Sequence, residues 1–269
     1  MQLIRRWRGR LMTQRAPAPA QTAEPPGDGL PENFEANRKL WNDYAAGWTP
    51  GFRGYEATSE GPPPAQYAHL GDEWGRPEDV DRVVGEFILP FVGAGSRVAE
   101  VGTGGGRIAS RVHPQVGEFW CFDISAEMLN RARTALGDDP RLHYQLLESP
   151  RFPDELAGTF DFVYAFDVFV HLDLHMTWRY LQEFTRLVKP GGMFMVHTSN
   201  LATRGGWAFF ASQERFNLST HHFVTPNVVA TMLSHLPVDV VTESSEDPEN
   251  FYLGRDYLAV CRRQGGPAA

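Results

Sequence analysis

Glycines and two acidic residues stand close together in one part of the chain. Glu100 precedes Gly102 by two positions, and Gly104 and Gly106 follow it. Asp123 ends the next apolar run, 21 residues after Gly102. Glycine permits a sharp turn and close backbone approach to a ligand, and the free amides of a helix start bind polar groups. A carboxylate can accept from both hydroxyls of a ribose. The pattern predicts a site for a nucleotide-type cofactor.

The glycine spacing argues against a dinucleotide. The dinucleotide fingerprint is G-x-G-x-x-G or G-x-G-x-x-A. Counted from Gly102, this chain has Gly102, Gly104 and then Arg107, so a large side chain stands where close helix–strand packing requires a small one. An NAD-dependent oxidoreductase is the competing enzyme class, although the glycine spacing argues against it. Binding of NAD would favour this class.

The spaced glycines, with Glu100 before them and Asp123 after them, resemble those of the class I S-adenosylmethionine (SAM)-dependent methyltransferases. The resemblance implies that SAM is the cofactor and that the glycine turn surrounds its methionine half. It implies that Glu100 fixes the amino-acid end and that Asp123 accepts hydrogen bonds from the ribose. It further implies a seven-stranded sheet whose last strand is antiparallel to the rest.

Further residues match the family's cofactor site. Ile124 and Met128 stand where adenine-packing residues occur, although a methionine at helical spacing also suits core packing. Glu148 and Ser149 follow the third apolar run, where an acid often accepts from the adenine amino group; Asp is more usual there than Glu. Phe166, at the tip of the fourth run, completes the predicted cofactor-binding set.

Three residues are candidates for a catalytic role. Methyl transfer from SAM is a direct displacement, so the protein supplies positioning and, for a hydroxyl acceptor, a base. His171 is the first candidate because its ordinary pKa suits proton transfer near neutral pH; its alternative is a backbone or helix-capping role. Asp167 is the second, with positioning of SAM as its alternative, and His222 is the third, with a solvated loop histidine as its alternative.

A metal site is weighed and set aside. His171 and His175 have the i, i+4 spacing of some metal ligands. Metal-dependent catechol-type methyltransferases carry an Asp-Asn pair at the tip of the fifth strand, where this chain has Ser199-Asn200. We therefore expect a mechanism without a metal.

The elements that must position these residues form an α/β fold. Apolar strands alternate with helical segments from residue 97 to 196, which predicts a doubly wound, mostly parallel sheet. Ligands of such sheets lie beyond the carboxyl ends of the strands. We expect helices over 33–44, 77–90 and near 225–234, and a helix that ends at Lys189 where Pro190-Gly-Gly192 breaks it.

The chain divides into three parts. We expect a disordered, basic and Pro/Ala-rich tail over 1–31, an N-terminal lid with the first helix over 32–95, and a SAM-binding domain over 96–265. Segments 40–76, which includes Tyr67 and Trp74, and 199–224, a substrate-side insertion, are placed to cover the acceptor.

Composition limits the partners. The chain has 269 residues and a formal net charge of −8, which disfavours nucleic acid as a partner. Cys121 and Cys261 lie in predicted strands, as small core residues do, and fit a reducing cytoplasm. No apolar run approaches a membrane span. We expect a small-molecule substrate and a cytoplasmic protein, as a monomer or homodimer.

The leading hypothesis is O-methylation of a metabolite or sugar-like hydroxyl. N-methylation of a small amine is the nearest alternative, because an unprotonated amine needs less help from a base. A non-catalytic SAM-binding partner subunit is the alternative of another class, since Glu100 and Asp123 imply binding but not turnover.

Overall fold

Seven strands form one mixed sheet in the order β3-β2-β1-β4-β5-β7-β6 within the described part of the chain. The computed structural model describes residues 32–49, 68–216 and 220–265, all within the compact unit Pro31–Ala269. The expected tail at 1–31 and Tyr67 lie outside the described residues. The strands are β1 (Arg97–Val101), β2 (Glu118–Asp123), β3 (Leu142–Leu146), β4 (Phe160–Tyr164), β5 (Val188–Ser199), β6 (Val238–Glu243) and β7 (Asp256–Arg263).

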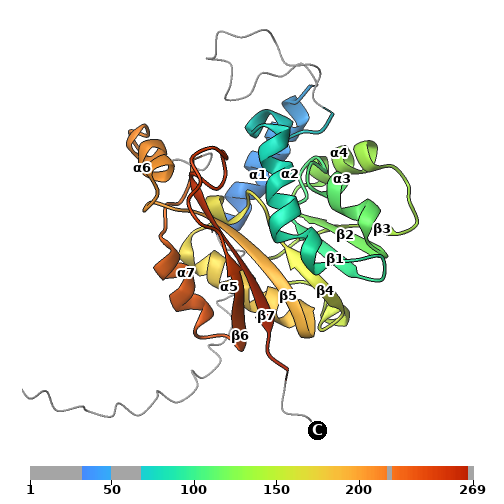
Figure 1. Ribbon diagram of the computed structural model, residues 1–269. Helices are drawn as coiled ribbons and strands as arrows, with labels where there is room; N and C mark the ends of the chain where they lie inside the picture. The colour runs from blue at the N-terminus through green and yellow to red at the C-terminus, as the bar shows by residue number, and fades with distance from the viewer. Residues whose placement is uncertain (1–31, 50–67, 217–219, 266–269) are drawn as a thin grey trace, which may run out of the picture. The chain divides into compact units, whose positions relative to one another are not determined.

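Helices cover both faces of the sheet (Figure 1). The α-helices are α1 (Glu32–Gly47), α2 (Pro77–Phe87), α3 (Ala109–Val112), α4 (Ala126–Leu136), α5 (Leu174–Leu187), α6 (Arg204–Ala211) and α7 (Pro226–Leu233). The short 3-10 helices are η2 (Asp72–Trp74), η3 (Leu89–Phe91), η4 (His113–Gln115), η5 (Asp154–Leu156) and η6 (Phe169–His171).

Alternation along the strands builds two cores. In β1, Val98 packs with α2 and α3, whereas Ala99 and Val101 pack with α5 and α7 on the opposite face. This follows from the two-residue period of a strand. Because both faces are covered at the centre of the sheet, β1 and β4 are mostly apolar and buried, as is usual for parallel strands. Cys121 and Cys261 are fully buried in β2 and β7, as expected.

The strand directions confirm the predicted fold class. β1 pairs in parallel with β2 and β4, and β4 pairs in parallel with β5. β7 is antiparallel to both β5 and β6. The strand order reverses between β1 and β4, which is the switch point where open α/β sheets bind ligands. Among the described helices, none is long and apolar enough to cross a membrane.

The element boundaries differ from expectation at several places, and α2 ends at Phe87 instead of residue 90. The helix before Pro190 ends at Leu187 instead of Lys189, and the Pro-Gly-Gly turn lies within β5. The pairing of β4 with β5 shifts register there, and Gly191 has a φ of 79°. The sequence analysis also gave no helix within the expected insertion, where the structure has α6.

Candidate active site

One cavity lies at the carboxyl ends of β1, β2 and β4, beneath α1 and the segment 68–75. It contains about 860 Å³ of space outside the protein atoms, part of it open to solvent. Nine predicted site residues line it: Glu100, Gly102, Gly104, Asp123, Ile124, Met128, Phe166, Asp167 and His171. The sheet thus gathers residues from the ends of three strands around one opening.

Four predicted site residues do not line this cavity. Gly106 has a φ of 88° and serves the turn itself. Glu148 is exposed and Ser149 is half-buried, whereas their neighbour Leu147 lies in the cavity wall. His222 packs against Phe216, with ring centroids 4.5 Å apart. These positions give the adenine role of Glu148 and Ser149 and the catalytic role of His222 no support from cavity lining.

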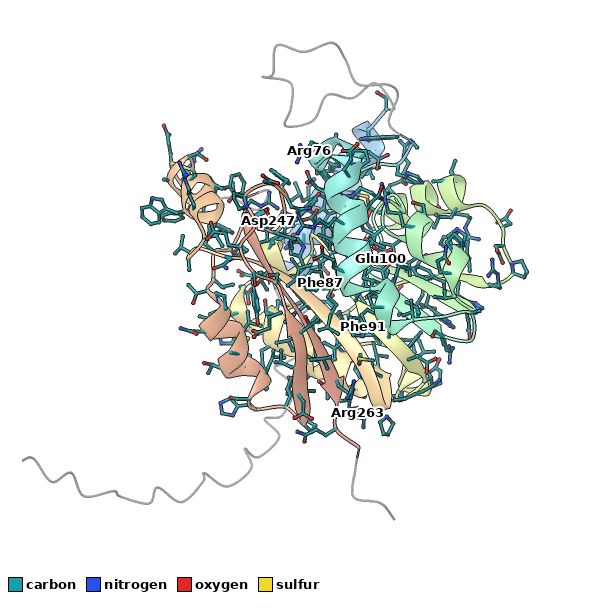
Figure 2. All side chains as sticks on the ribbon, in the orientation of Figure 1. Arg76, Phe87, Phe91, Glu100, Asp247 and Arg263 are labelled. Carbon is teal, nitrogen blue, oxygen red and sulfur yellow. The ribbon has the colours of Figure 1, made fainter. Side chains whose placement is uncertain are left out.

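Glu100 is a buried carboxylate with an open acceptor position. It lies in the interior near the end of β1 (Figure 2), and its side chain is 1% exposed. Its Oε2 has no hydrogen-bond partner among the described residues. Burial raises the pKa of Glu100 well above its usual value, against the opposing charge of Arg107. A cationic ligand group would provide the missing partner.

Asp123 is held in place by backbone amides. The amide of Gly104 donates to its Oδ2 at 2.9 Å, and the amide of Ser125 donates to its Oδ1 at 2.8 Å. Burial raises its pKa to about 6, although these bonds favour the ionised form. Each carboxylate oxygen keeps a second lone pair. Gly104 has a φ of 56° and open space where a Cβ would stand, so a ligand can approach its backbone.

Asp167 is ion-paired at the tip of β4. Its φ of 56° is the one positive value at a described residue other than glycine, a conformation that costs energy. Arg107 Nη2 lies 2.7 Å from its Oδ2, and Arg255 Nη2 lies 3.8 Å from its Oδ1. Burial alone would raise the pKa of Asp167, but His197, Arg107 and Arg255 hold it below its usual value. The group is therefore an ionised anchor.

His197 stabilises the conformation of Asp167 through a hydrogen bond to its backbone. The amide of Asp167 donates to His197 Nδ1 at 2.9 Å, so Nδ1 carries no hydrogen and Nε2 donates to Asp256 at 3.0 Å. Asp167, His197 and Asp256 also bring possible metal-ligand atoms within 4.8 Å of one another. Arg107 and Arg255 already supply positive charge to both carboxylates, and His197 is bonded at both nitrogens.

His171 is buried and neutral. It is 9% exposed, and burial lowers its pKa to about 4. The sequence analysis assumed an ordinary histidine pKa, and this assumption is wrong. The ring of Trp41 meets it edge-on, with centroids 5.0 Å apart. His175 is exposed at the start of α5, whereas His171 belongs to η6, so the two histidines do not share a helix.

Ser199 and Asn200, at the tip of β5, bind the backbone. Ser199 Oγ donates to the carbonyl of His222, and Asn200 accepts from the amide of Ala202. Arg255 and Asp256 form an ion pair, at 2.6 Å. Asp161, at the opposite end of β4, accepts from the backbone of residue 97 and from Lys189.

An aromatic lid covers the cavity. Trp41 of α1 and Trp74 of η2 line it, with ring centroids 5.8 Å apart. The hydroxyl of Tyr44 donates to the buried Glu73, which also accepts from the amide of Gly71. These bonds attach the segment 68–75 to α1. Trp74 thus occupies the lid position expected of it.

Sequence reasoning missed Asn37, Trp41 and Arg107 as cavity residues. Asn37 and Trp41 are spaced i, i+4 on a helix that the sequence predicted, so they share one face. The shared helix face of Asn37 and Trp41 could have indicated that both residues point into a site. Arg107 was treated only as a departure from the dinucleotide pattern, but its guanidinium binds both Asp167 and Tyr252.

The fold is that of the class I methyltransferases, and comparisons with known proteins agree. Residues 99–196 match a family model described as a methyltransferase domain. The structure is similar to magnesium protoporphyrin IX methyltransferase from Synechocystis PCC 6803 with bound SAM, at 14% identity, a TM-score of 0.58, and coverage of 88% of this chain and 100% of that one.

A second similar structure is a methyltransferase of Haloferax volcanii in complex with the Trm112 activator. The identity is 16%, the TM-score is 0.58, and the match covers 74% of this chain and 94% of that one. No curated protein matches the chain. Residues 99–196 therefore carry a methyltransferase domain, and the fold is that of the similar methyltransferase structures.

Proposed function

We propose that this enzyme transfers a methyl group from SAM to a hydroxyl oxygen of a small molecule. The observation that carries the proposal is a single cavity whose walls include Glu100 and Asp123 together with Trp41 and His171. A cofactor bound at the acidic residues would share this space with an acceptor bound beneath the lid. Such an enclosed arrangement supports catalysis by proximity and by exclusion of water.

The acidic end of the cavity suits the polar groups of SAM. Glu100 Oε2, buried and without a partner in the described ranges, would accept from the ammonium group of the methionine half. Asp123, held by two backbone amides, would accept from the ribose hydroxyls through its remaining lone pairs. Ile124 and Met128 line the adjoining wall and would pack against adenine.

SAM and two residues of the chain, Asp167 and His171, have separate roles in the proposed reaction. SAM, when bound, supplies a methyl group activated by a positively charged sulfur. Asp167, fixed by Arg107, holds the tip of β4 in its strained conformation and so fixes the walls around the acceptor. His171, neutral at pH 7, can accept a hydroxyl proton.

N-methylation of a small amine is the second candidate function. The lowered pKa of His171 favours it, because an unprotonated amine already carries the attacking lone pair and needs no strong base. A non-catalytic SAM-binding subunit would bind the cofactor equally well and transfer nothing.

Transfer of labelled methyl groups tests the proposal. The enzyme is incubated with SAM labelled in its methyl group and with a fractionated extract of the source cell. We expect label in a small-molecule fraction, as a methyl ether. Label on nitrogen would establish the second candidate, and cofactor binding without any transfer would contradict an enzymatic role.

A further inference from the structure

Two polar atoms in the cavity wall lack partners. Asn37 and His171 both line the cavity and are 1% and 9% exposed. Asn37 Oδ1 and His171 Nδ1 are both buried, and neither has a hydrogen-bond partner within the described part of the chain. An unsatisfied buried polar group costs free energy, so each of these atoms is a position that a ligand would stabilise.

The orientation of the Asn37 amide is fixed by its surroundings. Its Nδ2 donates to the carbonyl of Asn33 at 2.9 Å, and it also lies 3.3 Å from Asn33 Oδ1 and 3.4 Å from the carbonyl of His171. All three neighbours are acceptors, so the nitrogen must stand there. The remaining atom, Oδ1, is an acceptor for a donor that the ligand brings.

His171 presents an acceptor of its own. The ring's hydrogen bond with the backbone of Thr220 raises its pKa, as a ring N–H that donates to a carbonyl does. Since Nδ1 is the nitrogen without a partner, Nε2 carries the hydrogen in the neutral ring. His171 Nδ1 is therefore a bare lone pair.

The walls around this pair are aromatic. The ring of Trp41, four residues from Asn37 on α1, meets His171 edge-on at 5.0 Å and Trp74 at 5.8 Å. Phe166 lines the cavity as well. Aromatic surfaces stack on flat apolar rings.

We propose that the acceptor is an aromatic ring with two hydrogen-bond donors: a hydroxyl that binds His171 Nδ1 and is methylated, and a second donor that binds Asn37 Oδ1. This inference rests on the proposed function and narrows its substrate class. In the reaction, the hydroxyl oxygen bonds to the methyl carbon while the carbon–sulfur bond breaks and leaves its electron pair on sulfur. The hydroxyl proton passes to His171 Nδ1 and then to solvent.

Among hydroxyls, a phenol suits this histidine better than an aliphatic alcohol. A phenolic hydroxyl has a pKa of about 10, as tyrosine does, whereas burial lowers the pKa of His171 to about 4. Transfer of the proton to this weak base is unfavourable for either hydroxyl, but less so for the phenol. We therefore expect a phenolic hydroxyl in preference to a sugar-like one.

Binding of simple probes tests the two-donor site. The full chain, saturated with S-adenosylhomocysteine (SAH), is titrated with phenol and with catechol, resorcinol and hydroquinone by ligand-observed NMR. We expect at least one dihydroxybenzene to bind about 5- to 10-fold more tightly than phenol, the effect of one further hydrogen bond to a buried acceptor. If none binds more tightly than phenol, the proposal is overturned.

Variants separate the two acceptors. Asn37→Leu should reduce the affinity of the preferred dihydroxybenzene to that of phenol and leave phenol unchanged. His171→Gln, whose amide can still donate to Thr220, should weaken both probes, whereas His171→Asn should retain part of the binding. The matched control is His175→Gln, at an exposed histidine, which should change neither.

SAH affinity distinguishes the two proposals. Each variant is first titrated with SAH by calorimetry, and unchanged affinity shows that its fold is intact. If the wild-type chain does not bind SAH, the proposed function is contradicted. Normal SAH binding, with equal affinities for phenol in wild type and His171→Gln, would overturn only the two-donor site.

Discussion

Glu100 and Asp123 are both buried carboxylates, yet their surroundings prepare them for different partners. Two backbone amides fix Asp123, so its remaining lone pairs have a defined direction. Glu100 keeps an oxygen without a partner in the described structure and lies near Arg107. Asp123 therefore suits neutral hydroxyls, and Glu100 suits a cation. SAM carries hydroxyls on its ribose and an ammonium group on its methionine half.

Replacement of Asp123 tests the ribose assignment. Asp123→Ala should weaken SAH binding by at least about tenfold, because it removes charge-assisted hydrogen bonds to two hydroxyls. Calorimetry at pH 7.5 measures the change. Glu127→Ala, at an exposed acid on the neighbouring helix α4, is the matched control. Equal affinities for wild type and Asp123→Ala would remove the ribose role.

The buried histidine makes stability depend on pH. The folded pKa of His171 is about 4, below its usual value of 6.5, so the unfolded chain binds more protons between these values. Stability from this group is complete above pH 6.5 and falls as pH decreases to 4. Between pH 7 and pH 5 its loss is about 2 kcal/mol.

His171→Gln should therefore flatten the pH dependence of unfolding. Urea titrations of wild type and variant at pH 7 and pH 5 measure it. His221, whose pKa burial lowers to about 3, acts in the same direction and should leave a residual slope. An unchanged difference between pH 7 and pH 5 in His171→Gln would show that this ring does not titrate as described.

At the scale of elements, the lid rests directly on the glycine turn. A Cβ at Gly105 would lie 2.5 Å from the Cβ of Leu70 and 2.7 Å from its carbonyl oxygen. Gly105 lies between two of the predicted motif glycines, Gly104 and Gly106. The middle one of these three consecutive glycines therefore permits the close approach of the segment 68–75.

Gly105→Ala should displace this lid. We expect destabilisation of about 1–3 kcal/mol, as for overpacked positions, and at least tenfold weaker SAH binding. Gly85→Ala is the control, since Gly85 is exposed within α2 with nothing near its missing Cβ. That change should stabilise the protein by about 1 kcal/mol. Normal SAH affinity in Gly105→Ala would mean that the lid does not contribute to the cofactor site.

Elements were more predictable than contacts. Apolar runs with turn residues between them set β1 to β5, and the acidic first turn of α2 marks its start, since these signals are local. Ile124 and Met128, which line the cavity, were predicted because they lie next to the motif. Asn37 and Arg107 were missed because their roles depend on partners 134 and 60 residues away, at His171 and Asp167.

At the scale of the whole molecule, a buried network of charges joins four parts of the chain. Arg107 follows β1, Asp167 follows β4, His197 lies in β5, and Arg255 and Asp256 lead into β7. Arg107 also donates to the hydroxyl of Tyr252. Because strands from both halves of the sheet meet here, the network fixes their ends relative to the cavity.

Removal of one member should destabilise the protein strongly. Arg107→Met leaves Asp167 buried with a weaker partner, and we expect a loss of about 3–5 kcal/mol. Asp167→Asn should cost less, and the double variant should be more stable than the sum of the two changes predicts. Urea unfolding of all four proteins measures this. Additive effects would show that the ion pair is not coupled.

The cavity at the switch point between β1 and β4 is the expected binding site for SAM. Calorimetric titration of the full chain with SAM, SAH and NAD tests it most directly. We expect one site for SAM and for SAH, and no heat from NAD. Binding of NAD with no response to SAM or SAH would contradict it.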